Sequence, residues 1–331
     1  METEIKKILI KCPRTELEII GCFPFIVTIS EEFPKAEINI IVEDNCSLAL
    51  SFLPFKVKVY ERPVVKKSLI ETHHFCANMN AIFNIDLFFD LENSFNSAFM
   101  GFNFRAVERV GFEVKWNKVF LTKKYPLPVS LSIEKQSMKL LELYLNKPMQ
   151  DIRISKTKET GQSIDTIEKL FKEPEPPKFI MIMLDNFINT SAQIELWKIF
   201  FDSFQKQKFI IWSQFDENII SDLFASIDLG HNDLFIQRGS NIKEMIYLFS
   251  KVKGIVTNNL WAEGVCNYIG VDSLTLLDKK THLPQYDFFK FKPQRIFLGP
   301  DGIIEHHVLD EVREMKDINQ VVDQIHFNFK L

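Results

Sequence analysis

Short apolar, β-rich runs alternate with segments of helical periodicity in both halves of this chain. In the first half, Lys7 to Lys11 and Ala36 to Val42 are predicted strands, and Ile19 to Ser30 between them is a predicted helix. Strands that alternate with helices predict a parallel sheet covered on both faces, and therefore an α/β fold. Further strands are predicted at Val57 to Tyr60, Ile85 to Phe89 and Gly111 to Val114.

A polar, proline-containing segment interrupts this alternation, with KTKETGQ leading to KEPEPPK. We expect a first domain at residues 1–155, a linker at 156–177 and a second domain at 178–331. An amphipathic pattern from Val308 to Ile325 predicts a C-terminal helix that packs back across the domains. The strands predicted in the second domain are Phe179 to Leu184, Lys208 to Trp212, Leu234 to Gln237 and Gly254 to Thr257. Its predicted helices are Ser191 to Gln205, Ile219 to Ile227 and Ile242 to Lys251.

Composition excludes several classes of function. A net charge of -4 with mixed signs gives no broad basic field, so we expect no nucleic-acid partner. Five scattered cysteines without CxxC spacing favour a reduced, cytoplasmic chain. The start METEIKKILIKC has no secretory pattern, and no apolar stretch is long enough to span a membrane. The phenylalanines from Phe95 to Phe104 fit core packing, or an apolar patch that faces acceptor or membrane.

Several segments, in order, resemble glycosyltransferase family nine, the family of the ADP-heptose lipopolysaccharide heptosyltransferases. They are KILIKCPRTELEIIGCFPFI, FPKAEINIIVE, DLFFDLENSFNSAFM, RVGF, IIWSQFDE, SNIKEMIYLFSKVKGIVTNN and YIGV. The resemblance implies a GT-B architecture, in which two Rossmann-like lobes face a central cleft. It places the acceptor on the first lobe and a nucleotide sugar, ADP-linked in the family, on the second. No metal or other cofactor is expected.

The resemblance also assigns a catalytic base. Family members carry Gly-Asp in the turn after the first strand, and counting back from Pro24 places Leu17 and Glu18 at those positions. Glu18 would deprotonate the acceptor hydroxyl, and Glu16 takes that role if the turn holds a one-residue insertion. The alternative interpretation is that Glu18 is an acid in a first helical turn, where the helix dipole favours it.

On the donor side, the family binds diphosphate through a Ser/Thr pair and a Lys after the first strand of the second lobe. The matching positions hold Asp185, Asn186 and Thr190, and Asp185 also fits the role of a turn or cap residue. Glu217 occupies the position that contacts the nucleoside in the family, and its alternative is a surface acid before a helix. These positions therefore predict a donor site that lacks the diphosphate-binding lysine of the family.

The most diagnostic family motif, Asp-Ser/Thr-Gly-x-x-His, lies at a helix start where backbone N–H groups meet phosphate. In this chain Asn259 stands for the Asp, Leu260 for the hydroxyl residue, Trp261 for the Gly and Gly264 for the His. An indole at the third position would fill the space of a phosphate unless it turns away. The motif thus locates the donor site while most of its chemistry is changed.

Three functions remain open from the sequence. The first is an inverting, metal-independent glycosyltransferase that acts on a cell-envelope glycan or glycolipid such as lipopolysaccharide core. The second is a catalytically inactive GT-B scaffold that binds a partner. The third, a UDP-sugar epimerase, lacks the segment-by-segment match. For the transferase, we expect a cytoplasmic protein peripheral to the inner face of the cytoplasmic membrane.

Overall fold

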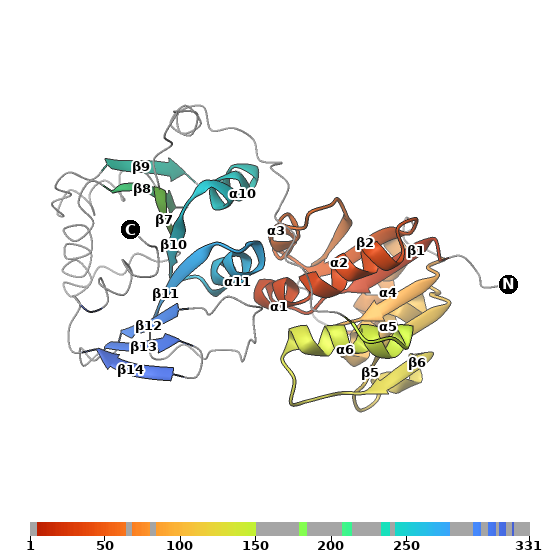
Figure 1. Cartoon of the computed structure of the whole chain (residues 1–331). Helices are drawn as coiled ribbons and strands as arrows, with labels where there is room; N and C mark the ends of the chain where they lie inside the picture. The colour runs from red at the N-terminus through yellow and green to blue at the C-terminus, as the bar shows by residue number, and fades with distance from the viewer. Residues whose placement is uncertain are drawn as a thin grey trace. The chain divides into compact units, whose positions relative to one another are not determined.

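The computed structural model divides into two compact units, Met1–Arg153 with Gln285–Asp287, and Ile154–Pro284 with Phe288–Leu331. It describes residues 5–63, 68–79, 84–149, 179–183, 207–213, 233–238, 242–278, 294–298, 304–308, 311–315 and 320. The predicted linker at 156–177 lies outside the described residues. Figure 1 traces the described elements of both units.

The first unit contains a six-stranded sheet in the order β3-β2-β1-β4-β5-β6. Every neighbouring pair in it is parallel, as the predicted alternation of strands and helices requires. The chain winds outward from β1 in one direction and then from β4 in the other, so the order reverses between these two strands. The strands are β1 (Lys7–Lys11), β2 (Glu37–Glu43), β3 (Lys58–Arg62), β4 (Leu87–Asp90), β5 (Glu108–Glu113) and β6 (Lys123–Pro126).

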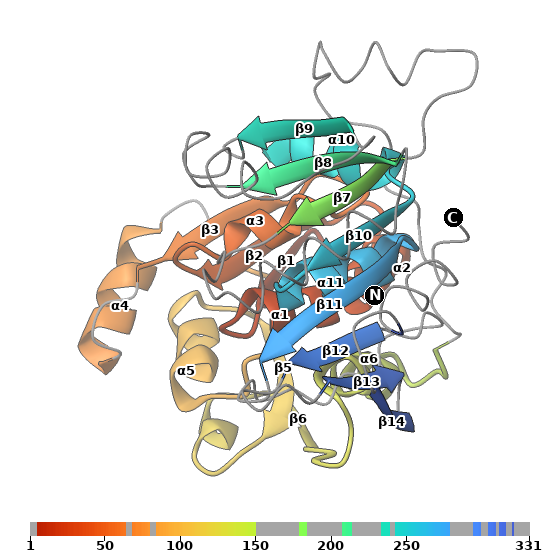
Figure 2. The same cartoon turned by 90° about the vertical axis from the view of Figure 1, so that its left-hand side faces the viewer.

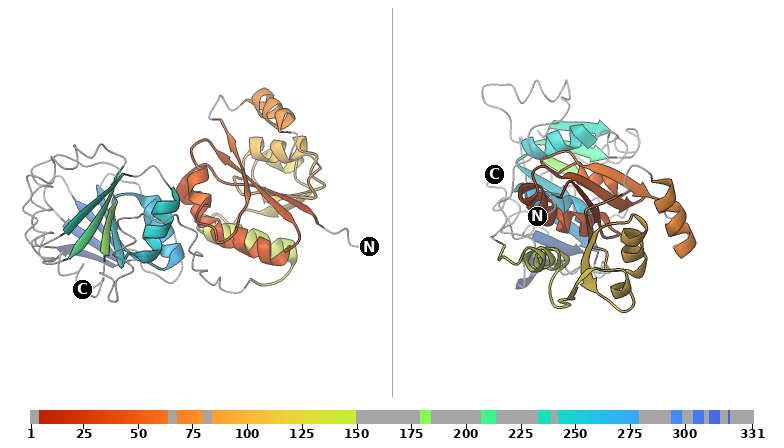
Figure 3. Two further views of the ribbon diagram at one scale, coloured as in Figure 1. Left: turned by 90° about the horizontal axis from the view of Figure 1, so that it is seen from above. Right: turned by 90° about the vertical axis from the view of Figure 1, so that its right-hand side faces the viewer.

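Helices cover both faces of this sheet. In the left view of Figure 3, α2 and α6 lie on one face and α4 and α5 lie on the other. The helices are α1 (Glu16–Gly21), α2 (Phe23–Glu32), α3 (Ser47–Leu50), α4 (Leu69–Asn78), α5 (Phe95–Asn103) and α6 (Ile133–Leu145), with a 3-10 turn η2 (Asn117–Val119) after β5.

The helix predicted from Ile19 to Ser30 is two helices that meet at Cys22. Pro24 stands in the first turn of α2, where its missing N–H costs nothing, whereas inside one continuous helix it would break a hydrogen bond. The sequence therefore predicts a helical segment here correctly, but it misses two features. The segment is divided at Cys22, and α1 begins at Glu16, before the predicted Ile19.

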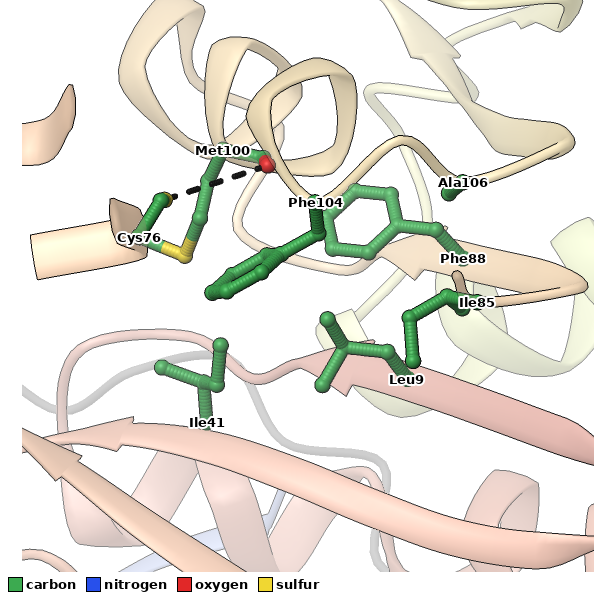
Figure 4. Packing of buried hydrophobic residues seen from close by; sticks show 8 residues of the cluster. All are labelled: Leu9, Ile41, Cys76, Ile85, Phe88, Met100, Phe104 and Ala106. Atoms are coloured by element: carbon green, nitrogen blue, oxygen red, sulfur yellow. Dashed lines mark hydrogen bonds between the residues drawn. The ribbon is translucent and has the colours of Figure 1, made fainter. Parts of the chain in front are cut away.

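A hydrophobic cluster joins α4 and α5 to the sheet, and Figure 4 shows its side chains. It consists of Leu9, Ile41, Cys76, Ile85, Phe88, Met100, Phe104 and Ala106. Gly101 lets α5 approach β4 closely, since a Cβ atom built there would lie 2.4 Å from the Phe88 ring. Close packing of α5 fixes the position of the loop that precedes it, which carries part of the site described below.

The second unit contains an eight-stranded sheet in the order β14-β13-β12-β11-β10-β7-β8-β9. Strands β7 to β12 repeat the winding of the first unit, with the reversal between β7 and β10, and α10 and α11 lie against one face (Figures 1 and 2). The parallel strands are β7 (Phe179–Met183), β8 (Lys208–Ser213), β9 (Asp233–Arg238), β10 (Gly254–Thr257), β11 (Asp272–Asp278) and β12 (Gln294–Leu298). The remaining elements are α10 (Ile242–Lys251), α11 (Leu260–Ile269), β13 (Ile304–Val308) and β14 (Glu311–Met315).

The C-terminal prediction requires correction. Val308 ends β13, and Glu311–Met315 is a strand that pairs antiparallel with it, although the pattern predicted helix from Val308 to Ile325. The backbone of β13 offers hydrogen-bond partners to the residues that follow it. This pairing outweighs the helical spacing of the apolar residues in a short segment. The rest of that segment lies outside the described residues except Gln320, as do the helices predicted at 191–205 and 219–227.

Candidate functional site

A pocket of about 230 Å³ opens at the carboxyl edge of the first sheet. It lies where the strand order reverses, between the loops that follow β1 and β4, with the start of α6 opposite them. In open α/β sheets, ligands bind outside the carboxyl ends of the strands at such a reversal. The lining residues are Pro13, Arg14, Glu18, Cys22, Leu91, Glu92, Asn93, Phe112, Ile133, Gln136 and Ser137.

Glu18 lines this pocket and also caps α1. Its Oε2 atom accepts a hydrogen bond of 3.1 Å from the backbone N–H of Thr15, and its own N–H donates to the Thr15 hydroxyl over 3.3 Å. This reciprocal arrangement satisfies backbone donors that a helix start otherwise leaves unpaired. Glu16 is half-buried in the same turn and is not among the residues that line the pocket. Glu18 is therefore an acid in the first turn of α1, as one sequence interpretation held, and it also lines the pocket; its role as catalytic base stays a prediction.

A buried array of charges lies directly behind the pocket. The Lys11 side chain at the end of β1 is fully buried, and its Nζ atom lies 2.9 Å from Glu92 Oε2 and 3.2 Å from Glu43 Oε1. Arg14 donates to Glu92 Oε1 from Nε over 2.9 Å and from Nη2 over 2.7 Å. Glu92 thus joins the buried lysine to the half-exposed arginine at the pocket wall, and this holds the guanidinium in one place.

The acid that ends β4, Asp90, and the acid in the loop after it, Glu92, differ in charge state. Burial alone would raise the pKa of Glu92, but the neighbouring Lys11 and Arg14 cations lower it to about 2. Burial instead raises the pKa of Asp90 to about 7, against opposing hydrogen bonds from Ser97 and the Asn93 amide. At neutral pH the pocket wall therefore carries an ionised Glu92, while Asp90 behind it is partly protonated.

The two cysteines nearest the pocket do not act as nucleophiles at neutral pH. Burial raises the pKa of Cys12 to about 12 and raises the pKa of Cys22 well above its usual range. A thiol that stays protonated is a weak nucleophile. The chemistry that the pocket offers is that of carboxylates, a guanidinium, amides and a hydroxyl, a set suited to polar ligands such as sugars.

In the second unit, the predicted donor motif follows β10, the strand at which that sheet reverses its order. Asn259 caps α11: its Oδ1 atom accepts from the Trp261 N–H over 2.9 Å, and its own N–H donates to the Thr257 hydroxyl over 3.0 Å. Leu260 and Trp261 are half-buried, whereas Gly264 is buried one turn further along. The structure therefore places a helix N-terminus where the motif predicted one.

Four predicted donor residues cannot be placed. Asp185, Asn186, Thr190 and Glu217 lie outside the described residues, and their assignments stay predictions.

Sequence reasoning missed the buried array of Lys11, Glu43 and Glu92, as well as Asp90 and Arg14. A signal was present, because three of the strands, β1, β2 and β4, each end on a charged residue: KILIK, EINIIVE and LFFD. Carboxyl ends of parallel strands meet at one edge of a sheet, so charges there come together. Which strands are neighbours, however, is not written in any local pattern.

No protein-family model and no curated protein sequence matches the chain. Among solved structures, Escherichia coli ADP-heptose lps heptosyltransferase II is similar over 98% of both chains, with a TM-score of 0.66 and 14% identity. The chain has the GT-B fold. The E. coli heptosyltransferase WaaC, solved with ADP-2-deoxy-2-fluoro heptose, matches 97% of this chain and 99% of its own, with a TM-score of 0.66 and 10% identity. The glycosyl transferase family 9 protein of Veillonella parvula matches 91% of this chain and 88% of its own, with a TM-score of 0.64 and 13% identity.

These GT-B neighbours confirm, at the level of fold, the resemblance predicted from short segments in both halves of the sequence. Within the part of the chain that the structure describes, no helix is long and apolar enough to cross a membrane.

Proposed function

We propose that this GT-B protein transfers a sugar, heptose-like and ADP-linked, from a nucleotide donor to a cell-envelope glycan such as lipopolysaccharide core. The observation that carries the proposal is a polar pocket lined by Glu18 at the reversal of the first sheet. It occurs in a chain similar along almost its whole length to solved ADP-heptose heptosyltransferases. The transfer inverts the anomeric configuration and uses no metal.

Glu18 is the proposed general base. One of its carboxylate oxygens accepts a hydrogen bond from the backbone N–H of Thr15, which fixes the side chain in the turn before α1. In the reaction, the carboxylate takes the proton of the acceptor hydroxyl as that oxygen attacks the anomeric carbon and the nucleoside diphosphate leaves. Arg14, held by Glu92, presents a fixed guanidinium at the pocket wall that orients a polar acceptor.

The donor belongs, in this proposal, to the second unit. The N-terminus of α11 presents backbone N–H groups beside Asn259, and such groups favour the negative charge of a diphosphate. Asp185, Asn186 and Thr190 follow the neighbouring strand β7, and we assign them with Leu260, Trp261 and Gly264 to the donor pocket. We assign Glu217 to the nucleoside. The reaction takes place on the cytoplasmic side of the membrane that carries the acceptor.

Glu18→Gln tests the catalytic assignment. A glutamine oxygen still accepts from Thr15, so helix α1 keeps its cap while the base is lost. We expect transfer to fall by roughly 100-fold or more, with donor affinity in titration calorimetry unchanged. Glu16→Gln, a neighbouring acid outside the pocket lining, is the matched control and retains activity.

Two results would overturn the proposal. Failure of the wild-type chain to bind any member of a nucleotide-sugar panel would support the inactive scaffold instead. Full activity in Glu18→Gln would refute the assignment of Glu18 as the base, although the transfer reaction itself would still stand.

A further inference from the structure

An aromatic surface covers α5 and the segment after β5. We define it by Phe95, Phe99, Phe102, Trp116, Val119 and Phe120. The Phe120 ring centroid lies 5.1 Å from that of Phe95, 5.2 Å from that of Phe99 and 5.7 Å from that of Phe102. Helix and segment therefore form one continuous layer.

Much of this layer faces solvent. Trp116 is 74% exposed, Val119 is 64% exposed and Phe102 is 53% exposed. Isolated apolar residues on a surface are normal, but a contiguous group that contains tryptophan and phenylalanine marks an interaction site. Tryptophan is also the side chain most typical of membrane interfaces, because its ring is apolar and its N–H is polar.

Positive charge borders the same surface. Lys115 and Lys118 flank Trp116 in the sequence, and Arg105 follows the last turn of α5 beside Phe102; all three cations are exposed. None of them takes part in the ion pairs among the residues that the structure describes. Glu113 is an exposed acid in this stretch, so the border carries an excess of positive charge.

One end of the aromatic surface lies at the edge of the first sheet where the pocket opens, and its other end, at Phe102, lies towards the start of β5. The pocket is lined by Leu91 to Asn93 after β4 and by Phe112 near the end of β5. Helix α5 begins directly after the first of these segments, and Trp116 follows shortly after the second. A flat partner that covers the aromatic surface would therefore reach, at one end, the edge of the sheet where the pocket opens.

We propose that the aromatic surface docks this protein on an anionic phospholipid bilayer. Exposed tryptophan and phenylalanine enter the headgroup region, while Lys115, Lys118 and Arg105 lie against negatively charged headgroups. The combination of apolar side chains with bordering cations matches an anionic lipid surface in both respects. The inference goes beyond the proposed transfer reaction, since docking needs neither donor nor catalysis.

The test is co-sedimentation of the full chain with vesicles of phosphatidylcholine alone or of equal parts phosphatidylcholine and phosphatidylglycerol. We expect binding to the anionic vesicles that weakens with salt. Trp116→Ala should lower the partition coefficient on the order of tenfold, and the Lys115→Gln/Lys118→Gln double variant should lower it by roughly fivefold per lysine.

Control variants remove an exposed apolar side chain and exposed positive charge elsewhere on the same unit. Val129→Ala changes an exposed apolar residue outside the aromatic surface, and Lys6→Gln/Lys56→Gln changes two exposed lysines that precede β1 and β3, at the opposite edge of the sheet. Neither should alter binding.

The proposal is overturned if the wild type does not bind anionic vesicles, or if the surface variants bind as well as their controls. It is also overturned if Trp116→Ala changes the oligomeric state in sedimentation velocity, since the occupant is then a second copy of the chain. Transfer to a soluble acceptor fragment, measured in parallel, reports on the catalytic proposal separately.

Discussion

Replacing Lys11 by methionine should destabilise the first unit strongly. Methionine matches the length of the lysine stem but removes the cation that lies between Glu43 and Glu92, so two buried carboxylates lose their shared partner. Breaking a buried ion pair from one side costs about 3–5 kcal/mol. The Glu92 pKa gives an upper bound for its part of the loss: Lys11 and Arg14 together lower it from 4.5 to about 2, and at about 1.4 kcal/mol for each tenfold change in proton affinity the two cations contribute about 3 kcal/mol.

The pH dependence follows from the direction in which the Glu92 pKa moves. Because the folded-state pKa of Glu92 is depressed, its stabilisation is present above the ordinary value of 4.5 and is lost as the pH falls towards about 2. The wild type should lose this stabilisation in acid. Lys11→Met lacks the share that comes from Lys11 and keeps the share from Arg14, so its stability should change less over the same range.

Hydrogen–deuterium exchange of the β1 and β4 amides measures the opening free energy of this unit without interference from the second unit. The control is Lys58→Met, which removes a lysine on β3 from an exposed pair with Glu37 on β2, at 2.6 Å. That change should have little effect, because solvent screens the pair. Equal effects of the two substitutions, or an unchanged acid dependence in Lys11→Met, would refute the reasoning.

Two further predictions concern Asp90 and Asn259. Because burial raises the Asp90 pKa from 3.8 to about 7, the first unit should lose stability as the pH rises through that range. Asp90→Asn keeps an acceptor for the Asn93 amide, so near pH ~4 its stability should match that of the wild type. Its advantage over the wild type should then grow by about 1.4 kcal/mol for each further pH unit, up to pH ~7. Amide-exchange stabilities that change with pH in the same way for both proteins would count against this. Asn259→Ala removes the cap of α11 and should cost about 1 kcal/mol in exchange of the α11 amides, while Asn259→Ser should retain most of it; equal losses in both variants would show that the cap contributes nothing.

Local patterns predicted the elements wherever helix and strand propensities agreed with tertiary context. Helix α10 and strand β10 begin and end at the predicted residues, Ile242–Lys251 and Gly254–Thr257. The segment after Val308 was predicted wrongly, because its apolar period fits a helix while the edge of the sheet offered pairing to β14. Such pairing depends on a neighbour that no window of sequence contains.

The candidate site was predicted in part. Glu18 was located by counting back from Pro24, and the structure places it on the pocket wall. Its second role, as the partner of the N-cap residue Thr15 at the start of α1, also follows from the sequence. Thr followed three residues later by Glu is the pattern of a capping box. The contact of Lys11 with Glu92 did not follow, because it requires β4 to lie beside β1.

The sequence by itself determined that this chain forms two α/β sheets with parallel strands at their centres, because alternation of apolar runs with amphipathic helices leaves few other ways to bury both sheet faces. Only the tertiary structure decided which strand ends are neighbours. The order β3-β2-β1-β4-β5-β6 brings Lys11, Glu43 and Glu92 together from three separate loops and strand ends. Long-range pairing is set by the packing of the whole sheet, and it is this pairing that places buried charge behind a pocket at the reversal of the strand order.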